Sequence, residues 1–226
     1  MGFVNSAIGF FQNGGPFMYP IAVVLLIGLA ISFERWISLT VSRASNRRAF
    51  DRIVPLLKRK DYNAVANEAK GNSAPVARMV AAGLARMQQT PRREDIEYAM
   101  EEGVLEAVPR LEKRTAYIAT LANIATLLGL LGTIMGLISA FTAVANADPS
   151  EKATLLSQSI SVAMNTTAFG LMAAIPLLLL HTNIQNKTTE IVDSLEMAGV
   201  KCLNIISGSL ANKSRAADSV QKPATR

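Results

Sequence analysis

The sequence predicts an all-α membrane protein with three transmembrane helices and long cytoplasmic helical extensions, and two observations lead to that prediction. First, the chain of 226 residues contains three long stretches without a charged side chain, at 1–33, 116–147 and 153–180. At about 1.5 Å per residue, a helix over each stretch can cross a hydrocarbon core of about 30 Å. Second, the 23 Lys and Arg residues lie outside these stretches, with 15 of them in residues 41–114.

Composition and charge exclude several other classes of protein. A chain with 50% hydrophobic residues is neither disordered nor collagen-like, and a single cysteine cannot build a disulfide framework within the chain. A net charge of +6 would ordinarily suggest a nucleic-acid partner. The charge divides into +5 in residues 41–114, +2 from residue 186 onward and −1 in residues 148–152. Such a division is typical of orientation in a membrane, so we expect a lipid bilayer and no nucleic acid as partner.

The first predicted transmembrane helix covers residues 16–40. Tyr19 lies near one end and Trp36 near the other, as expected of aromatic residues at the two membrane interfaces. The preceding segment 1–15 carries no positive charge, whereas a cleaved signal peptide begins with a basic region. We therefore expect a retained helix with residues 1–15 in the periplasm.

The second and third predicted transmembrane helices, 115–147 and 153–185, are joined by the short acidic turn 148–152 and form a tight hairpin. The positive-inside rule places the basic stretch 41–114 and the basic C-terminal part in the cytoplasm, and the N-terminus and the turn in the periplasm. Three crossings therefore leave the N-terminus outside and the C-terminus inside.

The cytoplasmic domain 41–114 is predicted to be helical, because apolar residues recur at helical spacing, with turns at residues 71–75 and 90–91. From Arg92 a helix is expected to run through Leu111 straight into the second transmembrane helix. After the third span, a cytoplasmic helix is expected over residues 186–211 and a polar, disordered tail over 212–226.

Small residues form a stripe along one face of the second span. In lipid, such a stripe lets helix backbones approach closely. A chain with three spans offers few internal partners for so wide a stripe, so the pattern favours self-association over packing within one chain. The stripe comprises Ala122, Ala125, Gly129, Gly132, Gly136, Ser139, Ala140 and Ala143.

Hydroxyl groups inside the two spans are the candidate ion-binding groups. If the hairpin folds symmetrically about Pro149 and Ser150, Thr133 lies at the depth of Thr166 and Thr167, next to Asn165, and these residues form a small polar ring. Hydroxyl oxygens can replace part of the hydration shell of an ion. The alternative is that each threonine only bonds the carbonyl one turn earlier in its own helix. Neither span contains an ionisable residue at this depth, so a proton path needs a carboxylate from a second protein.

The residues of the hairpin resemble a known family. The segment Leu128-Gly-Leu-Leu-Gly-Thr-Ile-Met-Gly-Leu137 and the segment Thr167-Ala-Phe-Gly170, followed by Pro176, are similar to paired motifs of the MotA/TolQ/ExbB proton-channel family. The Glu34-Arg35 end of the first span is similar too. Three spans rather than four place the chain nearer to ExbB and TolQ than to MotA.

The resemblance implies a homopentamer of the inner membrane around an ExbD/TolR-like pair of single-span partners, whose transmembrane Asp carries the proton. A TonB/TolA-like protein is a further implied partner. Thr133 and Thr167 match the pore threonines of the family, and Pro176 matches the proline of its third helix. The residues implied to pack the helices or line the pore are Gly129, Gly132, Gly136, Ala140, Gly170 and Pro176.

Two positions depart from the family pattern. Many ExbB and TolQ chains have a Glu five residues before the third-helix threonine, where this chain has Val162. Asn165 and Thr166 stand where proton-driven members are usually apolar or small, and a Thr-Thr pair resembles sodium-driven members. The expected coupling ion is H⁺, with Na⁺ bound by Thr133, Thr166 and Thr167 as the alternative, and no other cofactor is expected.

The sequence thus leads to two hypotheses. In the first, the chain is a subunit of an ion-driven motor that energises transport or mechanical work at the cell envelope. In the second, it is a passive oligomeric membrane scaffold whose threonines bond only to the backbone. No nucleophile–base pair, metal-ligand cluster or phosphate-binding loop occurs in the sequence, so we do not expect an enzyme.

Overall fold

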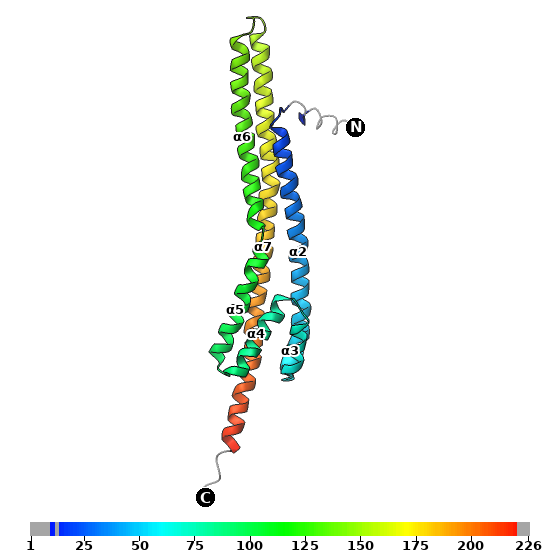
Figure 1. Ribbon diagram of the computed structural model, residues 1–226, viewed down its shortest axis with the longest axis vertical. Helices are drawn as coiled ribbons and strands as arrows, with labels where there is room; N and C mark the ends of the chain where they lie inside the picture. The colour runs from blue at the N-terminus through cyan, green and yellow to red at the C-terminus, as the bar shows by residue number, and fades with distance from the viewer. Residues whose placement is uncertain (1–9, 12–13, 221–226) are drawn as a thin grey trace. The chain divides into compact units, whose positions relative to one another are not determined.

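The computed structural model describes residues 10–11 and 14–220, with side chains described up to residue 209. These residues form the helices α2 (Met18–Lys58), α3 (Tyr62–Lys70), α4 (Pro75–Gln89), α5 (Arg93–Glu112), α6 (Thr115–Ala145) and α7 (Lys152–Val220) (Figure 1). No strand occurs among the described residues. The predicted all-α fold is confirmed, and the turns predicted at 71–75 and 90–91 separate α3 from α4 and α4 from α5.

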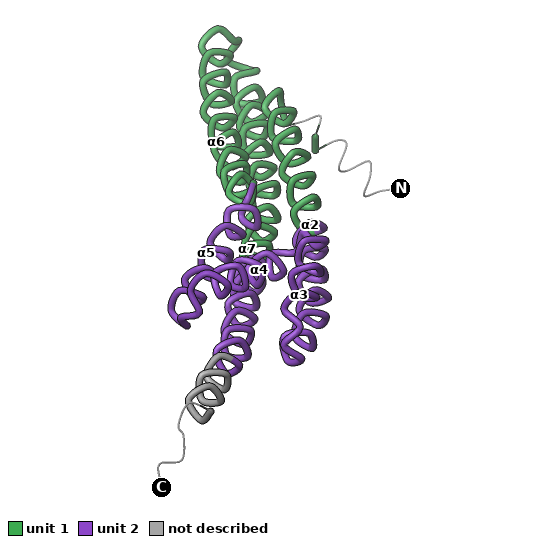
Figure 2. The backbone as a smooth tube through the Cα atoms, turned by 60° about the horizontal axis from the view of Figure 1, so that its bottom comes forward, with its two compact units in different colours: residues 1–36, 114–185 green, residues 37–113, 186–226 purple. Residues whose placement is uncertain are grey.

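Stretches of α2, α6 and α7 are long and apolar enough to cross a membrane, which confirms the prediction of three candidate spans. The chain divides into two compact units (Figure 2). We call Met1–Trp36 with Arg114–Gln185 the membrane unit, and Ile37–Lys113 with Asn186–Arg226 the charged unit. The helices α2 and α7 contribute residues to both units.

Side chains in the membrane unit are distributed as lipid requires. Small residues such as Ala122, Ala125 and Ala173 are fully buried between helices. Large apolar residues such as Leu127 and Phe141 are more than 60% exposed. In water this arrangement would be unfavourable, because the large apolar side chains would stay exposed. In a lipid bilayer, by contrast, helices associate through close packing of small residues. The packing therefore supports the membrane assignment independently of hydropathy.

The charged unit has the opposite arrangement, with large apolar residues inside. The C-terminal part of α2, the helices α3 to α5 and the C-terminal part of α7 enclose Ile53, Met79, Ile96 and Leu195, all at most 1% exposed. Asp61 caps α3 by accepting a hydrogen bond from the Ala64 N–H at 3.1 Å. Cys202 is also fully buried there, and burial raises the pKa of its thiol to about 11.

Two expected helix boundaries differ from the observed ones. The helix predicted to run from Arg92 into the second span is interrupted, because α5 ends at Glu112 and α6 begins at Thr115. Arg114 between them has a left-handed backbone with φ 65°, which a continuous right-handed helix does not contain. Conversely, α7 continues to Val220 through residues assigned to a polar tail, since Ala, Lys and Arg in this segment favour helix. Residues 221–226 of that predicted tail lie outside the described residues.

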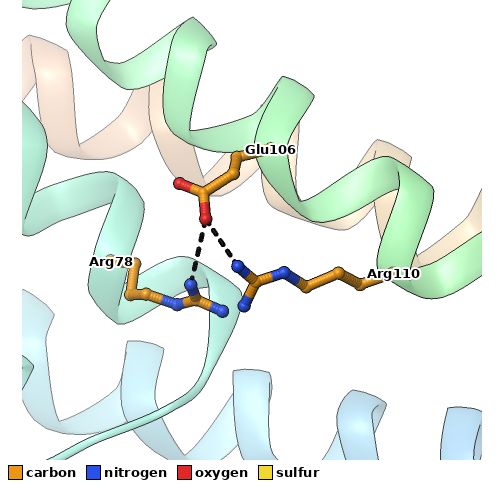
Figure 3. Close-up of polar contacts among 3 residues, drawn as sticks. All are labelled: Arg78, Glu106 and Arg110. Carbon is orange, nitrogen blue, oxygen red and sulfur yellow. Dashed lines mark hydrogen bonds and ion pairs between the residues drawn. The ribbon is translucent and has the colours of Figure 1, made fainter.

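An ion-pair cluster joins α4 to α5 in the charged unit (Figure 3). One carboxylate oxygen of Glu106 accepts hydrogen bonds from Arg78 at 3.2 Å and from Arg110 at 2.7 Å. All three side chains are at least 40% exposed, so water and salt screen the attraction. The cluster orients the two helices without contributing much to stability.

Replacing Glu106 with Gln is expected to lower the free energy of unfolding by less than about 1 kcal/mol, the usual range for exposed ion pairs. Thermal denaturation of the full-length chain in detergent, at low and at high salt, would measure the change. Glu102→Gln, an exposed residue of the same helix, is the matched control. A loss of several kcal/mol confined to Glu106→Gln would contradict this interpretation.

Candidate ion pathway

The hairpin of α6 and α7 is held together by close contact at two glycines. A Cβ atom added to Gly170 would lie 2.8 Å from the carbonyl oxygen of Ala125 and 2.9 Å from the Cα of Gly129. Further along, a Cβ added to Gly136 would lie 2.7 Å from the Cβ of Ala163. The pairs Gly129–Gly170 and Gly136–Ala163 are each equally distant in sequence from the Pro149–Ser150 turn. The predicted symmetric register of the hairpin is therefore confirmed.

Next to this contact, Thr133 of α6 and Thr167 of α7 are hydrogen-bonded to each other through their hydroxyl groups. The carbonyl oxygen of Gly129 lies 2.9 Å from the Thr167 hydroxyl and 3.3 Å from the Thr133 hydroxyl. Each hydroxyl has a single proton to donate. The pair is satisfied when Thr133 donates to Thr167 and Thr167 donates to the Gly129 carbonyl. Two oxygens from two helices are thus held together inside a charge-free segment.

Thr166 has different partners from Thr167. Its hydroxyl lies 2.6 Å from the carbonyl oxygen of Gly14 and 3.0 Å from that of Val162, and the residue is 2% exposed. Consecutive residues of an α-helix point about 100° apart. The Thr166 hydroxyl therefore bonds to the N-terminal segment, with its side-chain carbons against Gly132 of α6, whereas the Thr167 hydroxyl bonds to α6. Helical rotation places Asn165, which is half-buried, about 200° from Thr167. Of the predicted polar ring, the structure brings Thr133 and Thr167 together and directs Thr166 elsewhere.

The small-residue stripe of α6 is mostly used within the chain. Gly129 packs on Gly170 and Thr167, Gly136 packs on Ala163, and Gly132 faces Thr166 and Phe17. Ala122, Ala125 and Ala140 are fully buried. The interpretation that this stripe serves self-association is therefore wrong for these residues, because α7 and the N-terminal segment cover the glycines and the three alanines are buried within the single chain. Ser139 and Ala143 are exposed.

Pro176 lies inside α7 on an exposed face. Because proline has no backbone N–H, it cannot donate to the carbonyl of Met172 one turn earlier. An acceptor in the apolar part of the helix consequently lacks its usual helical donor. The effect of Pro176 on hydrogen bonding is thus confined to α7. A role of Pro176 in a pore stays a prediction.

The sequence reasoning missed the contribution of the N-terminal segment to the site. Gly15 adopts φ 74°, a conformation that favours glycine, and thereby turns the chain before α2. The Phe11 ring packs edge-on against Phe169, with centroids 5.7 Å apart, and Gly14 supplies the carbonyl that Thr166 binds. The Gly14-Gly15-Pro16 sequence signals a turn, but the sequence holds no signal for its position beside Thr166.

A hairpin with small residues inside, large apolar residues outside and buried hydroxyls defines a multi-pass α-helical membrane protein. Residues 72–197 match the model of the MotA/TolQ/ExbB proton channel family. The match covers more than half of the chain, so this chain belongs to that family. The relatives described next place it on the ExbB/TolQ side of the family. The family is one of ion channels rather than catalysts.

Three curated proteins illustrate the similarity. A putative biopolymer transport protein ExbB homolog of Methanothermobacter thermautotrophicus is 26% identical over 197 residues, which cover 86% of this chain and 68% of that protein. Putative ExbB-like protein 1 of Synechocystis is 29% identical, covering 84% and 74% of the two chains. The Tol-Pal system protein TolQ of Haemophilus influenzae is 33% identical over 95 residues, which cover 41% of this chain and 40% of TolQ.

Proposed function

We propose that this chain is an ExbB/TolQ-like subunit of an ion-driven motor in the cytoplasmic (inner) membrane. In this proposal a homopentamer surrounds an ExbD/TolR-like dimer and uses ion-motive force to energise transport or mechanical work at the cell envelope, with a TonB/TolA-like protein as the further partner. Family membership and the biopolymer transport names of the relatives support the transport role.

The observation on which the proposal rests is the Thr133–Thr167 pair in a charge-free hairpin. Paired hydroxyls can pass or solvate an ion but cannot hold a net charge at neutral pH. Since residues 116–147 and 153–180 contain no Asp, Glu, Lys, Arg or His, the titrating group of the path must come from elsewhere. A transmembrane Asp of a single-span partner supplies that group in the proposed mechanism.

Substituting valine for Thr133 or for Thr167 tests the proposal, because valine keeps the shape of threonine and removes the hydroxyl. Both variants are expected to assemble with the partner and to lose most ion-driven activity. Thr120→Val is the matched control, because the Thr120 hydroxyl is exposed and donates only to Ala116 of its own helix at 3.1 Å. Native mass spectrometry would measure assembly, and an energy-dependent envelope phenotype would measure activity. Full activity in both variants would favour the passive scaffold.

We propose H⁺ as the coupling ion, because Thr166 is bonded to Gly14 rather than directed toward Thr133 and Thr167. Activity is then expected to persist in sodium-free buffer. Thr166→Ala removes the donor to Gly14, so it should lower stability by about 1 kcal/mol without changing the ion requirement. Loss of parent activity in sodium-free buffer, restored by Na⁺, would instead establish sodium coupling.

A further inference from the structure

An acidic groove lies on the surface of the charged unit between α4, α5 and α7. Its volume is about 410 Å³, and the acidic residues that line it are Glu97, Glu101 and Glu196, with no basic residue among the lining side chains. Leu105 and Val200, which are 69% and 56% exposed, lie in the same groove. The groove thus combines exposed apolar area with uncompensated negative charge.

A basic groove lies in the same unit between α2, α4 and α7. Its volume is about 260 Å³, and its charged lining residues are Arg43, Arg47 and Lys201. Met197, which is 60% exposed, contributes apolar surface. Arg43 pairs with Glu190 at 3.0 Å, so the net positive charge of the groove comes mainly from Arg47 and Lys201.

The two grooves lie on opposite sides of α7. Glu196 and Val200 of the acidic groove are one helical turn apart on one face, whereas Met197 and Lys201 of the basic groove are one turn apart on another. At about 100° per residue, the mean directions of the full sets of α7 lining residues differ by roughly 180°. These sets are Glu196, Gly199, Val200 and Leu203 for the acidic groove, and Ser194, Leu195, Met197, Ala198 and Lys201 for the basic groove. A surface with opposite charges on opposite sides can bind a second copy of itself head to tail.

We propose that the acidic groove of one copy of this chain docks against the basic groove of the next copy, burying Leu105, Val200 and Met197 between subunits. The inference rests on the self-association that belongs to the proposed function, and it names the surfaces that make the contact. Because the two surfaces differ, the contact is heterologous, and its repetition generates a ring when the rotation between copies closes. Charge complementarity fixes which side of one subunit meets which side of its neighbour.

Crosslinking between engineered cysteines tests the inference in full-length protein in native membranes. A chain carrying both Glu101→Cys and Arg47→Cys is expected to form a ladder of covalent multimers with a short bis-maleimide reagent. Chains carrying only one of the two substitutions should crosslink only when they are mixed, and then mainly to dimers. The parent chain is the first control, because its single cysteine, Cys202, is fully buried.

The matched control carries Glu102→Cys and Arg48→Cys, which are exposed neighbours outside both grooves. It should give at least fivefold less crosslinked product. Equal yields in the two double variants, or crosslinking of Glu101→Cys chains with themselves, would overturn the inference. An oligomer by native mass spectrometry whose groove cysteines fail to crosslink would also overturn it, leaving another protein as the occupant of the grooves. A parent chain that is monomeric would instead contradict the proposed function.

Discussion

The full-length chain carrying Gly170→Val is expected to lose the native α6–α7 hairpin. Any Cβ at this position meets the Ala125 carbonyl oxygen at 2.8 Å and the Gly129 Cα at 2.9 Å, and both are backbone atoms that no side-chain rotation can move aside. The helices must separate, and separation also breaks the contact between Thr133 and Thr167. We expect destabilisation of about 3 kcal/mol or more, at the upper end of the range for overpacking.

Fluorescence-detected size exclusion and thermal denaturation in detergent would measure this effect. A loss of about 3 kcal/mol corresponds to a fall in melting temperature of about 10 °C for a protein of this size. Gly170→Ala should act in the same direction with a smaller effect. Gly208→Ala in the same helix is the control, since nothing lies within 4 Å of a Cβ there, and alanine should be neutral or stabilising. Native-like melting of Gly170→Val would show that the two backbones are not in contact.

A second large effect is expected at Gly103, where α5 crosses α4 in the charged unit. A Cβ at Gly103 would lie 2.9 Å from the Cα of Met79, which again is a backbone atom. Gly103→Ala should therefore lower the free energy of unfolding by about 2 kcal/mol, although alanine is the better helix former. Gly103→Val should lower the free energy of unfolding further, because α4 and α5 would have to move apart.

Gly199→Ala is the matched control for this prediction, because a Cβ at Gly199 also meets Met79, but at the flexible end of its side chain rather than at its backbone. There the Cβ would lie 3.3 Å from the sulfur of Met79 and 3.8 Å from its terminal methyl group. Met79 can change rotamer, so Gly199→Ala is expected to change stability by less than about 1 kcal/mol. Hydrogen exchange of α4 and α5 in the full-length chain would distinguish the two variants. Equal protection in both would contradict the backbone contact at Gly103.

Much of the fold could be predicted because the signals are local in sequence. Uncharged stretches of sufficient length predicted the three spans, and the Pro75 and Pro91 regions predicted the turns between α3, α4 and α5. The short turn at Pro149 and Ser150 fixed the register of the hairpin, so the depth of Thr133 relative to Thr167 followed from counting residues. The break at Arg114 carried no such signal, because an arginine with φ 65° is selected by tertiary structure.

The arrangement of the candidate site was less predictable, for a geometric reason. Adjacent residues of a helix point about 100° apart, so Thr166 and Thr167 cannot both face Thr133, and only the fold decides which one does. Outside its own helix, the Thr166 hydroxyl bonds to the Gly14 carbonyl, 152 positions away in sequence. Similarly, a stripe of small residues shows that another helix packs closely against it. The stripe does not show whether that helix belongs to the same chain or to another copy.

The neighbouring hydroxyls of Thr166 and Thr167 connect two different parts of the chain to one turn of α7. Thr167 binds the Gly129 carbonyl of α6, whereas Thr166 binds the Gly14 carbonyl before α2. Because the two residues share one rigid helical turn, a rotation of that turn about the axis of α7 strains both hydrogen bonds at once. One turn of α7 therefore holds both α6 and the segment that leads into α2, so a rotation that breaks the Thr167 contact would also strain the Thr166 contact.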